Sequence, residues 1–98
     1  MREAAEKAIA YTVGRNRSIL DSDEMRTLAV VRLVEIIGEA ARAVSEPTQT
    51  QFAEISWREI VGTRDRLIHG DEEVDLDILW TIVTEDLPVL VSELNRTG

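Results

Sequence analysis

The stretch that decides the fold is DEMRTLAVVRLVEIIGEAARAVS, residues 23–45. Its apolar residues recur at intervals of three and four, which is the period of an α-helix. The large ones, namely Val30, Val31, Leu33, Val34, Ile36 and Ile37, cover more of the circumference than the roughly 100° stripe of a helix that is buried on one side. We therefore expect this helix to bury two faces, one in the core of its own chain and one against a partner chain. Gly38, Ala40 and Ala41 are small enough to let another helix approach it closely.

Three further helices are predicted around this long one. The first covers residues 2–13, with small and apolar residues on one face, and ends at Gly14. The third covers residues 56–70 and opens with SWRE, whose serine and glutamate have the spacing of a capping box. The fourth begins near Asp75 and is kinked or divided at Pro88. The pattern predicts a single all-α domain that spans the whole chain, residues 1–98.

The segments between these helices contain capping and loop signals. Either Asp21 or Ser22 is placed to cap the long helix. Pro47 and the polar run TQTQ that follows it mark a loop. Phe52 and Ile55 are expected to pack that loop back onto the bundle.

Composition limits the functions that the chain can perform. Its 98 residues suffice for one hydrophobic core. Because it has no cysteine and a single histidine, we expect neither disulfide bonds nor a metal site of the ordinary zinc type. No stretch approaches the roughly 18 apolar residues of a membrane-spanning helix, and the amino terminus lacks the apolar core of a signal peptide. We therefore expect a cytoplasmic protein that does not bind membranes.

The charge is negative overall but unevenly distributed. A net charge of −8 argues against strong non-specific binding to nucleic acid, because contacts with phosphates supply most of that affinity. Residues 71–98 contain eight of the 19 acidic side chains but only one of the 11 basic ones. The first 70 residues can therefore still form a local cationic site.

The strongest chemical signal is GTRDRLIHGDEEVD, residues 62–75, which places two arginines and the only histidine within six residues. Arginine and histidine are also common at solvated carboxyl ends of helices, because cations interact favourably with the helix dipole there. The functional interpretation is cleavage of an RNA phosphodiester without a metal. In it, His69 moves a proton to or from the ribose oxygen while Arg64 stabilises the charge on phosphorus. Asp65, four residues before His69, is placed to hydrogen-bond the imidazole.

The predicted helix geometry separates these groups within one chain. On an ideal helix, Arg64 and His69 would point about 140° apart. A two-fold axis near this helix would instead bring arginine and histidine from two chains into one cleft. That arrangement agrees with the surplus apolar face of the long helix.

Three blocks of the sequence resemble the HepT-like proteins, which are minimal members of the HEPN group of helical domains. They are RLVEIIGEAARAVS (32–45), ISWREIVGTRDRLIHG (55–70) and VDLDILWTIVTEDLPVL (74–90). The resemblance spans nearly the whole chain and implies a homodimeric, up-and-down bundle of four to five helices. It also implies a metal-independent endoribonuclease without a cofactor, acting as the toxin of a toxin–antitoxin pair. The implied partners are RNA, often tRNA, and a small nucleotidyltransferase antitoxin.

The family motif consists of arginine, a polar residue, three variable positions and histidine, which Arg64, Asp65 and His69 match. On this resemblance Arg64 binds the scissile phosphate and His69 acts as general acid or base. Asp65 orients the histidine, and Arg66 is an auxiliary contact with RNA. The family continues with a tyrosine that the antitoxin modifies with adenylate, but this chain has Asp71 there. We therefore expect weaker cleavage than with tyrosine, and no adenylylation at position 71.

Two other functions are compatible with the same residues. In one, the domain is an interaction module with weak or no cleavage that binds a nucleotidyltransferase through its acidic surface. In the other, it is a regulatory bundle that binds nucleotides through the arginine cluster. Trp57 and Trp80 lie among apolar helix positions and are expected in the core, with stacking on RNA bases as the alternative.

Overall fold

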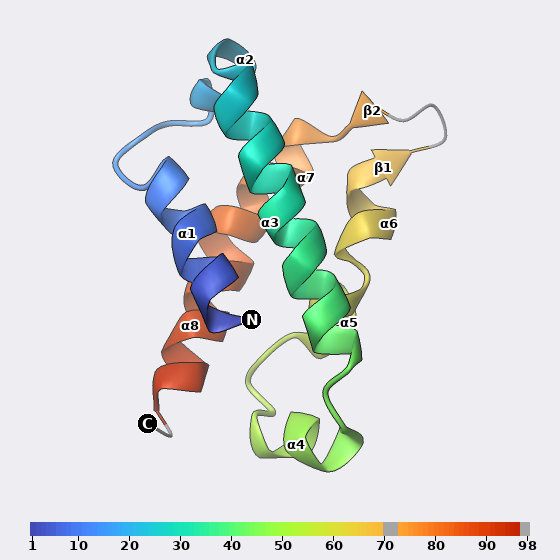
Figure 1. Ribbon diagram of the computed structural model, residues 1–98. Helices are drawn as coiled ribbons and strands as arrows, with labels where there is room; N and C mark the ends of the chain where they lie inside the picture. Colours follow the sequence, from blue (N-terminus) through green and yellow to red (C-terminus); the bar gives the residue numbers. More distant parts are fainter. Residues whose placement is uncertain (70–72, 97–98) are drawn as a thin grey trace.

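The computed structural model describes residues 1–69 and 73–96, with the backbone alone at His69 and Glu73. Helices form most of it, which confirms the predicted all-α class (Figure 1). The Cα atoms extend over 40 × 31 × 16 Å, so the molecule is a thin slab. Within the described residues, no helix is long and apolar enough to cross a membrane.

The long central helix is α3, Glu24–Arg42, close to the bounds predicted for it. It passes diagonally through the middle of the slab, with α1, Arg2–Thr12, packed against one side (Figure 1). One face of α3 is fully buried, through Val30, Val34, Ile37, Gly38 and Ala41, because these positions recur at helical spacing.

The cap of α3 differs from the prediction. Its N-cap is Asp23 rather than Asp21 or Ser22, and the Asp23 carboxylate accepts a hydrogen bond of 3.0 Å from the backbone N–H of Arg26. That bond, together with a second from the Arg26 guanidinium, lowers the pKa of Asp23. The predicted caps failed because the chain forms a short helix of its own just before α3, namely α2, Ile19–Ser22.

The last part of the chain forms one helical run that packs against α1 and covers the core (Figure 1). It consists of α7, Leu76–Thr81, the π-helical segment η1, Ile82–Asp86, and α8, Leu87–Asn95. Pro88 follows directly on η1, so the helical run continues but changes from π-helix to α-helix just before the predicted point of division. The buried residues of this helical run include Leu79, Ile82, Val83, Leu87 and Leu90.

The segment around Pro47 was wrongly predicted as a loop. It forms α4, Glu46–Gln51, with Pro47 in the first turn, where proline is well tolerated. The expectation that the following residues pack back onto the bundle is confirmed, since Ile55 is buried and Phe52 packs against the core. Trp80 also packs against the core from a partly buried position.

The predicted helix over residues 56–70 is interrupted at Gly62 and ends at Leu67, before the predicted end. The chain forms α5, Trp57–Val61, bends at Gly62, and forms α6, Thr63–Leu67. It then becomes extended as β1, Ile68–His69, which pairs antiparallel with β2, Glu73–Val74. The backbone N–H of Asp75 donates to the carbonyl of Leu67 at 2.7 Å, so the last carbonyl of α6 is satisfied by the returning strand rather than by a further helical turn. Ser56 is the N-cap of α5 but makes no side-chain cap bond, so the predicted capping box is absent.

Candidate active site

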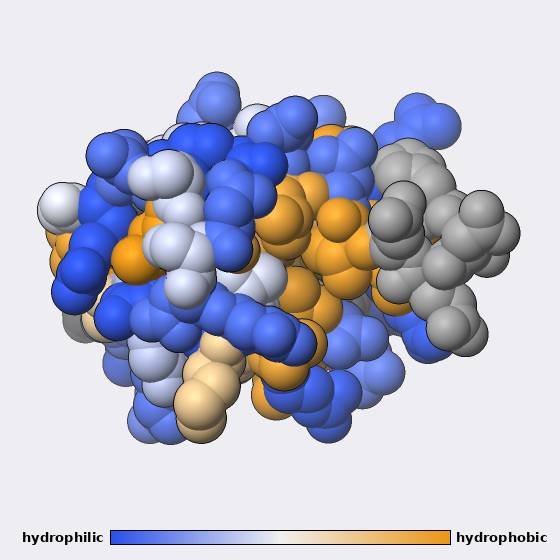
Figure 2. Space-filling model, turned by 90° about the horizontal axis from the view of Figure 1, so that it is seen from above, coloured by the Kyte–Doolittle hydropathy of each residue, from blue (hydrophilic) through white to orange (hydrophobic). Residues whose placement is uncertain are grey.

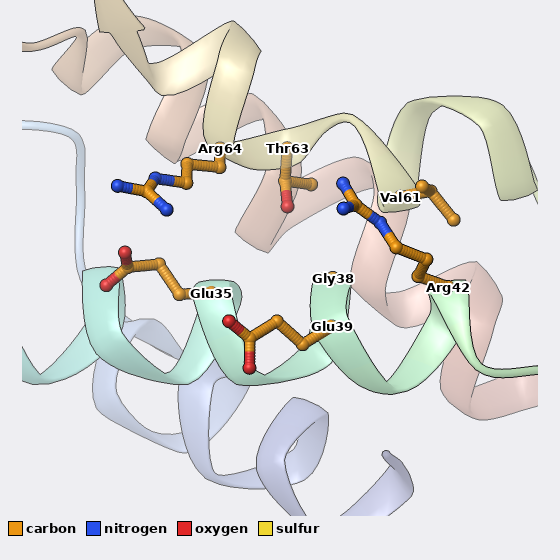
Figure 3. Close-up of a pocket in the computed structure, with 7 residues that line it drawn as sticks. All are labelled: Glu35, Gly38, Glu39, Arg42, Val61, Thr63 and Arg64. Carbon is orange, nitrogen blue, oxygen red and sulfur yellow. The ribbon is translucent and has the colours of Figure 1, made fainter.

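The groove between α3 and the α5–α6 segment contains the arginine of the predicted motif. It encloses a small cavity of about 70 Å³. The residues that line it are Glu35, Gly38, Glu39, Arg42, Val61, Thr63 and Arg64. Figure 3 shows side chains from α3 facing Arg64 and Thr63 across this groove, with the Arg42 guanidinium toward its other end. The groove is therefore charged on both walls.

Gly38 sets the distance between the two walls of the groove. A Cβ atom at position 38 would lie 2.7 Å from Thr63 Oγ1 and 3.1 Å from the backbone oxygen of Ile60. Ile60 and Thr63 are both fully buried, so neither can move aside easily. The close helix approach predicted from Gly38 is confirmed, and it is what brings α6 against α3.

Thr63 places an unsatisfied hydroxyl in this groove. Its side chain is 1% exposed, and Oγ1 has no hydrogen-bond partner among the described residues. Buried hydroxyl groups are normally hydrogen-bonded, because leaving one unpaired costs about 1–3 kcal/mol. The close packing of α6 on α3 must offset this cost.

Arg64 is exposed on α6 and free to bind an anion. Its guanidinium makes no hydrogen bond or ion pair with any residue whose side chain the structure describes. Glu35 and Arg64 extend toward one another in Figure 3, and no ion pair joins them. An exposed, unpaired guanidinium is what binding of a phosphate requires, since its fork of N–H donors matches phosphate oxygens.

Arg66, two residues further on, serves a different contact. Its Nη1 donates to the Asp86 carboxylate at 3.1 Å, and both side chains are largely shielded from solvent. This ion pair ties α6 to η1. The guanidinium is thus already engaged, and the auxiliary contact with RNA predicted for Arg66 stays a prediction.

The remaining motif residues lie around the point where α6 gives way to β1. Asp65 is exposed and lines an open recess together with Arg42, Arg64 and neighbouring apolar residues. Because the helix ends at Leu67, the helical spacing that would have joined Asp65 to His69 does not exist. The same change removes the angle of about 140° expected between Arg64 and His69 on one helix. The side chain of His69 and the whole of Asp71 lie outside the described residues, so their roles stay predictions.

Arg42 is the cation that sequence reasoning missed. It lies four residues after Gly38, one helical turn further along the face that meets α5, and it lines the groove beside Arg64. The spacing from Gly38 was the available signal, because residues four apart share a helix face. Arg42 and Arg64 thus line the same cavity from separate helices.

The sequence is similar to those of known proteins. A family model described as "Ribonuclease HepT-like" matches residues 1–97. A Methanocaldococcus jannaschii protein named "Putative RNase MJ1380" is 36% identical over 92 residues, which cover 94% of this chain and 84% of the relative. A Thermococcus cleftensis protein named "Probable ribonuclease HepT" is 39% identical over 74 residues, covering 76% of this chain and 67% of the relative. No solved structure matches the chain.

Proposed function

The chain belongs to the HepT-like ribonuclease family, and we propose that it is a cytoplasmic, metal-independent endoribonuclease that acts as a toxin. The observation that carries the proposal is the placement of Arg64. This residue matches the arginine of the family motif, and its guanidinium is exposed and unpaired among the described residues. An arginine kept only for the fold would be expected to form an ion pair, as Arg66 does with Asp86.

The proposed reaction uses the ribose 2′-hydroxyl as nucleophile. His69 acts as general base or acid at the ribose and leaving oxygens, and Asp65 assists it as a positioning residue. Arg64 neutralises the extra negative charge that develops on the phosphoryl oxygens in the transition state. The products are then a 2′,3′-cyclic phosphate and a free 5′-hydroxyl.

We expect the purified protein to cleave single-stranded RNA with undiminished rate in excess EDTA. The reason is that the proposed proton transfer and charge stabilisation are both supplied by side chains. Gel separation of end-labelled RNA, with chemical identification of the new termini, measures the outcome. DNA of the same sequence is the matched control, because it lacks the 2′-hydroxyl and should stay intact. Loss of cleavage on chelation, or cleavage of the DNA, would contradict the mechanism.

The proposed assembly is a two-fold dimer built on α3 and α6. Met25, Leu28 and Ile36 lie on the outer side of α3 and are 84%, 60% and 37% exposed. The slab is only 16 Å thick between Cα atoms, and Figure 2 shows hydrophobic side chains open to solvent between polar ones. A second copy would cover Met25, Leu28 and Ile36 and would bring Arg64 of each chain toward His69 of the other.

Leu28→Asp is expected to convert this dimer to a monomer and to lower RNA cleavage with it. Two carboxylates would be forced into an apolar, two-fold interface, where burying unpaired charge is costly. Sedimentation at micromolar concentration and the cleavage assay measure the two effects. Val89→Asp is the matched control, since Val89 is 45% exposed on α8, away from the proposed interface. A monomeric parent protein, or an unchanged dimer in Leu28→Asp, would rule out this interface.

The proposed regulatory partner is a small nucleotidyltransferase, as the family resemblance implies. A carboxylate carries no phenolic hydroxyl, so Asp71 cannot accept adenylate as the family tyrosine does. A protein that binds such a partner but does not cleave RNA would instead be the non-catalytic interaction module.

A further inference from the structure

The arginines of this protein fall into two groups. Five of them form ion pairs with carboxylates, namely Arg2, Arg17, Arg26, Arg66 and Arg96. The other five, namely Arg15, Arg32, Arg42, Arg58 and Arg64, form none with any described side chain and are exposed. Arg42, Arg58 and Arg64 among them come from α3, α5 and α6, and they line two adjoining recesses that share Arg42. In a protein with a net charge of −8, three unpaired cations along one groove call for an anionic ligand.

A recess beside the active site has no acidic side chain in its lining. It is open, measures about 350 Å³, and is lined by Arg42, Gln49, Trp57, Arg58 and Val61. That size lies in the range of sites that accept small ligands, which is roughly 300–1,000 Å³. The cavity beside Arg64, in contrast, also contains Glu35 and Glu39. The recess is thus the part of the groove best suited to a phosphate next to a flat apolar group.

Trp57 provides a fixed aromatic surface in this recess. Its indole N–H donates to the backbone carbonyls of Gln49 at 3.1 Å and Phe52 at 3.0 Å. The ring also packs against the core on one side while remaining partly exposed. Stacking on such a ring costs little conformational entropy, because both of its χ angles are already restricted.

Arg42 and Val61 connect the recess to the active site. Both residues line the recess that contains Trp57, and both also line the one that contains Arg64 and Asp65. A chain of phosphates can therefore follow Arg58, Arg42 and Arg64 in order along one surface. α5 lies beside the carboxyl end of α3, and α6 lies further along its side (Figure 1).

We infer that this recess is a subsite for a nucleotide of single-stranded RNA next to the cleaved bond, with its base on Trp57 and its phosphates on Arg42 and Arg58. The inference rests on the proposed ribonuclease function and adds the residues that hold the flanking nucleotide. Stacking tolerates any base, since every base has a π-face. The subsite thus contributes affinity and position rather than sequence preference.

A short 2′-O-methyl oligoribonucleotide tests the subsite separately from cleavage, because it lacks the attacking hydroxyl. Binding is measured by fluorescence anisotropy over a range of salt concentrations. In the Arg42→Gln/Arg58→Gln variant, the slope of log affinity against log salt should fall by about 1.4, since each phosphate contact on single strands contributes about 0.7. Arg15→Gln, which removes an exposed charge in the segment between α1 and α2, is the control and should lower neither affinity nor cleavage markedly.

Trp57 is tested in the same assay. Trp57→Ala should weaken binding by about 5- to 100-fold, whereas Trp57→Phe, which keeps a ring, should retain most of the affinity. Circular dichroism checks that both variants fold. If the alanine variant is unfolded, quenching of Trp57 fluorescence by the oligonucleotide in a Trp80→Phe background decides whether a base stacks there.

The results separate this inference from the proposed function. If the parent protein cleaves RNA and the double arginine variant binds with unchanged affinity and salt slope, the subsite is wrong and the ribonuclease function stands. The same conclusion follows if those arginines affect binding of a protein partner but not of RNA. If the parent protein neither binds nor cleaves RNA, both are wrong.

Discussion

Arg64→Ala is expected to lower the rate of RNA cleavage by about 10²- to 10³-fold, the usual effect of removing one group that stabilises charge in a transition state. The residue is exposed and makes no ion pair with a described side chain, so its removal should leave thermal stability and helical circular dichroism unchanged. His69→Ala is expected to lower the rate by about 10²- to 10⁴-fold through loss of proton transfer. Single-turnover cleavage with saturating enzyme measures the chemical step directly.

Two further arginine variants serve as comparisons for Arg64→Ala. Arg64→Lys keeps the charge but loses the planar fork of donors, so it should recover only part of the rate. Arg66→Ala breaks the contact with Asp86 and should lower the thermal midpoint more than the cleavage rate per folded molecule. Full activity of Arg64→Ala would contradict the role in cleavage that is proposed for Arg64. A rate loss in Arg66→Ala as large as that in Arg64→Ala, at unchanged stability, would restore Arg66 as a contact with RNA.

Gly38→Val is expected to destabilise the fold by about 3 kcal/mol or more, because overpacking a tight helix contact typically costs 1–3 kcal/mol even for small additions. Its Cβ would already lie 2.7 Å from Thr63 Oγ1, and the two methyl groups would extend further. For a chain of this size that corresponds to a fall of roughly 10–20 °C in the thermal midpoint. Gly38→Ala should be milder, since the gain of about 1 kcal/mol in helix propensity offsets part of the clash. Thermal unfolding at one fixed protein concentration measures both.

A double-mutant cycle tests whether the loss of stability at position 38 comes from the close contact with Thr63. Thr63→Ala removes the oxygen atom nearest to the new Cβ, so Gly38→Ala/Thr63→Ala should be more stable than the sum of the single changes indicates. Ala10→Val, at an exposed position of α1, controls for the cost of a β-branched residue in a helix. Equal losses in Gly38→Val and Ala10→Val would show that the contact between α3 and α6 is not tight.

The candidate site was predictable from the sequence only in part. The spacing of Arg64, Asp65 and His69 is local information, because a motif of this kind lies in one short segment. Arg42 and Arg58 belong to separate segments, and they join Arg64 along one groove only because Gly38 lets α6 pack closely on α3. The pairing of Arg66 with Asp86, 20 residues away, is likewise a tertiary contact that no local pattern indicates.

The sequence by itself determined the all-α class and the long helices. The apolar residues of α3 recur at helical spacing over 19 residues. Every turn therefore favours burial of the same face, and a single tertiary contact cannot change which face is buried. The tertiary structure alone decided the short elements, namely α2, α4, the bend at Gly62 and the change from α6 to β1. Segments of four to six residues are too short to be stable helices in isolation, so their conformation depends on which backbone and core groups reach them. At the end of α6, the backbone N–H of Asp75 donates to the carbonyl of Leu67. In a longer helix that carbonyl would accept a hydrogen bond from a later turn, but here the chain becomes extended as β1 from Ile68.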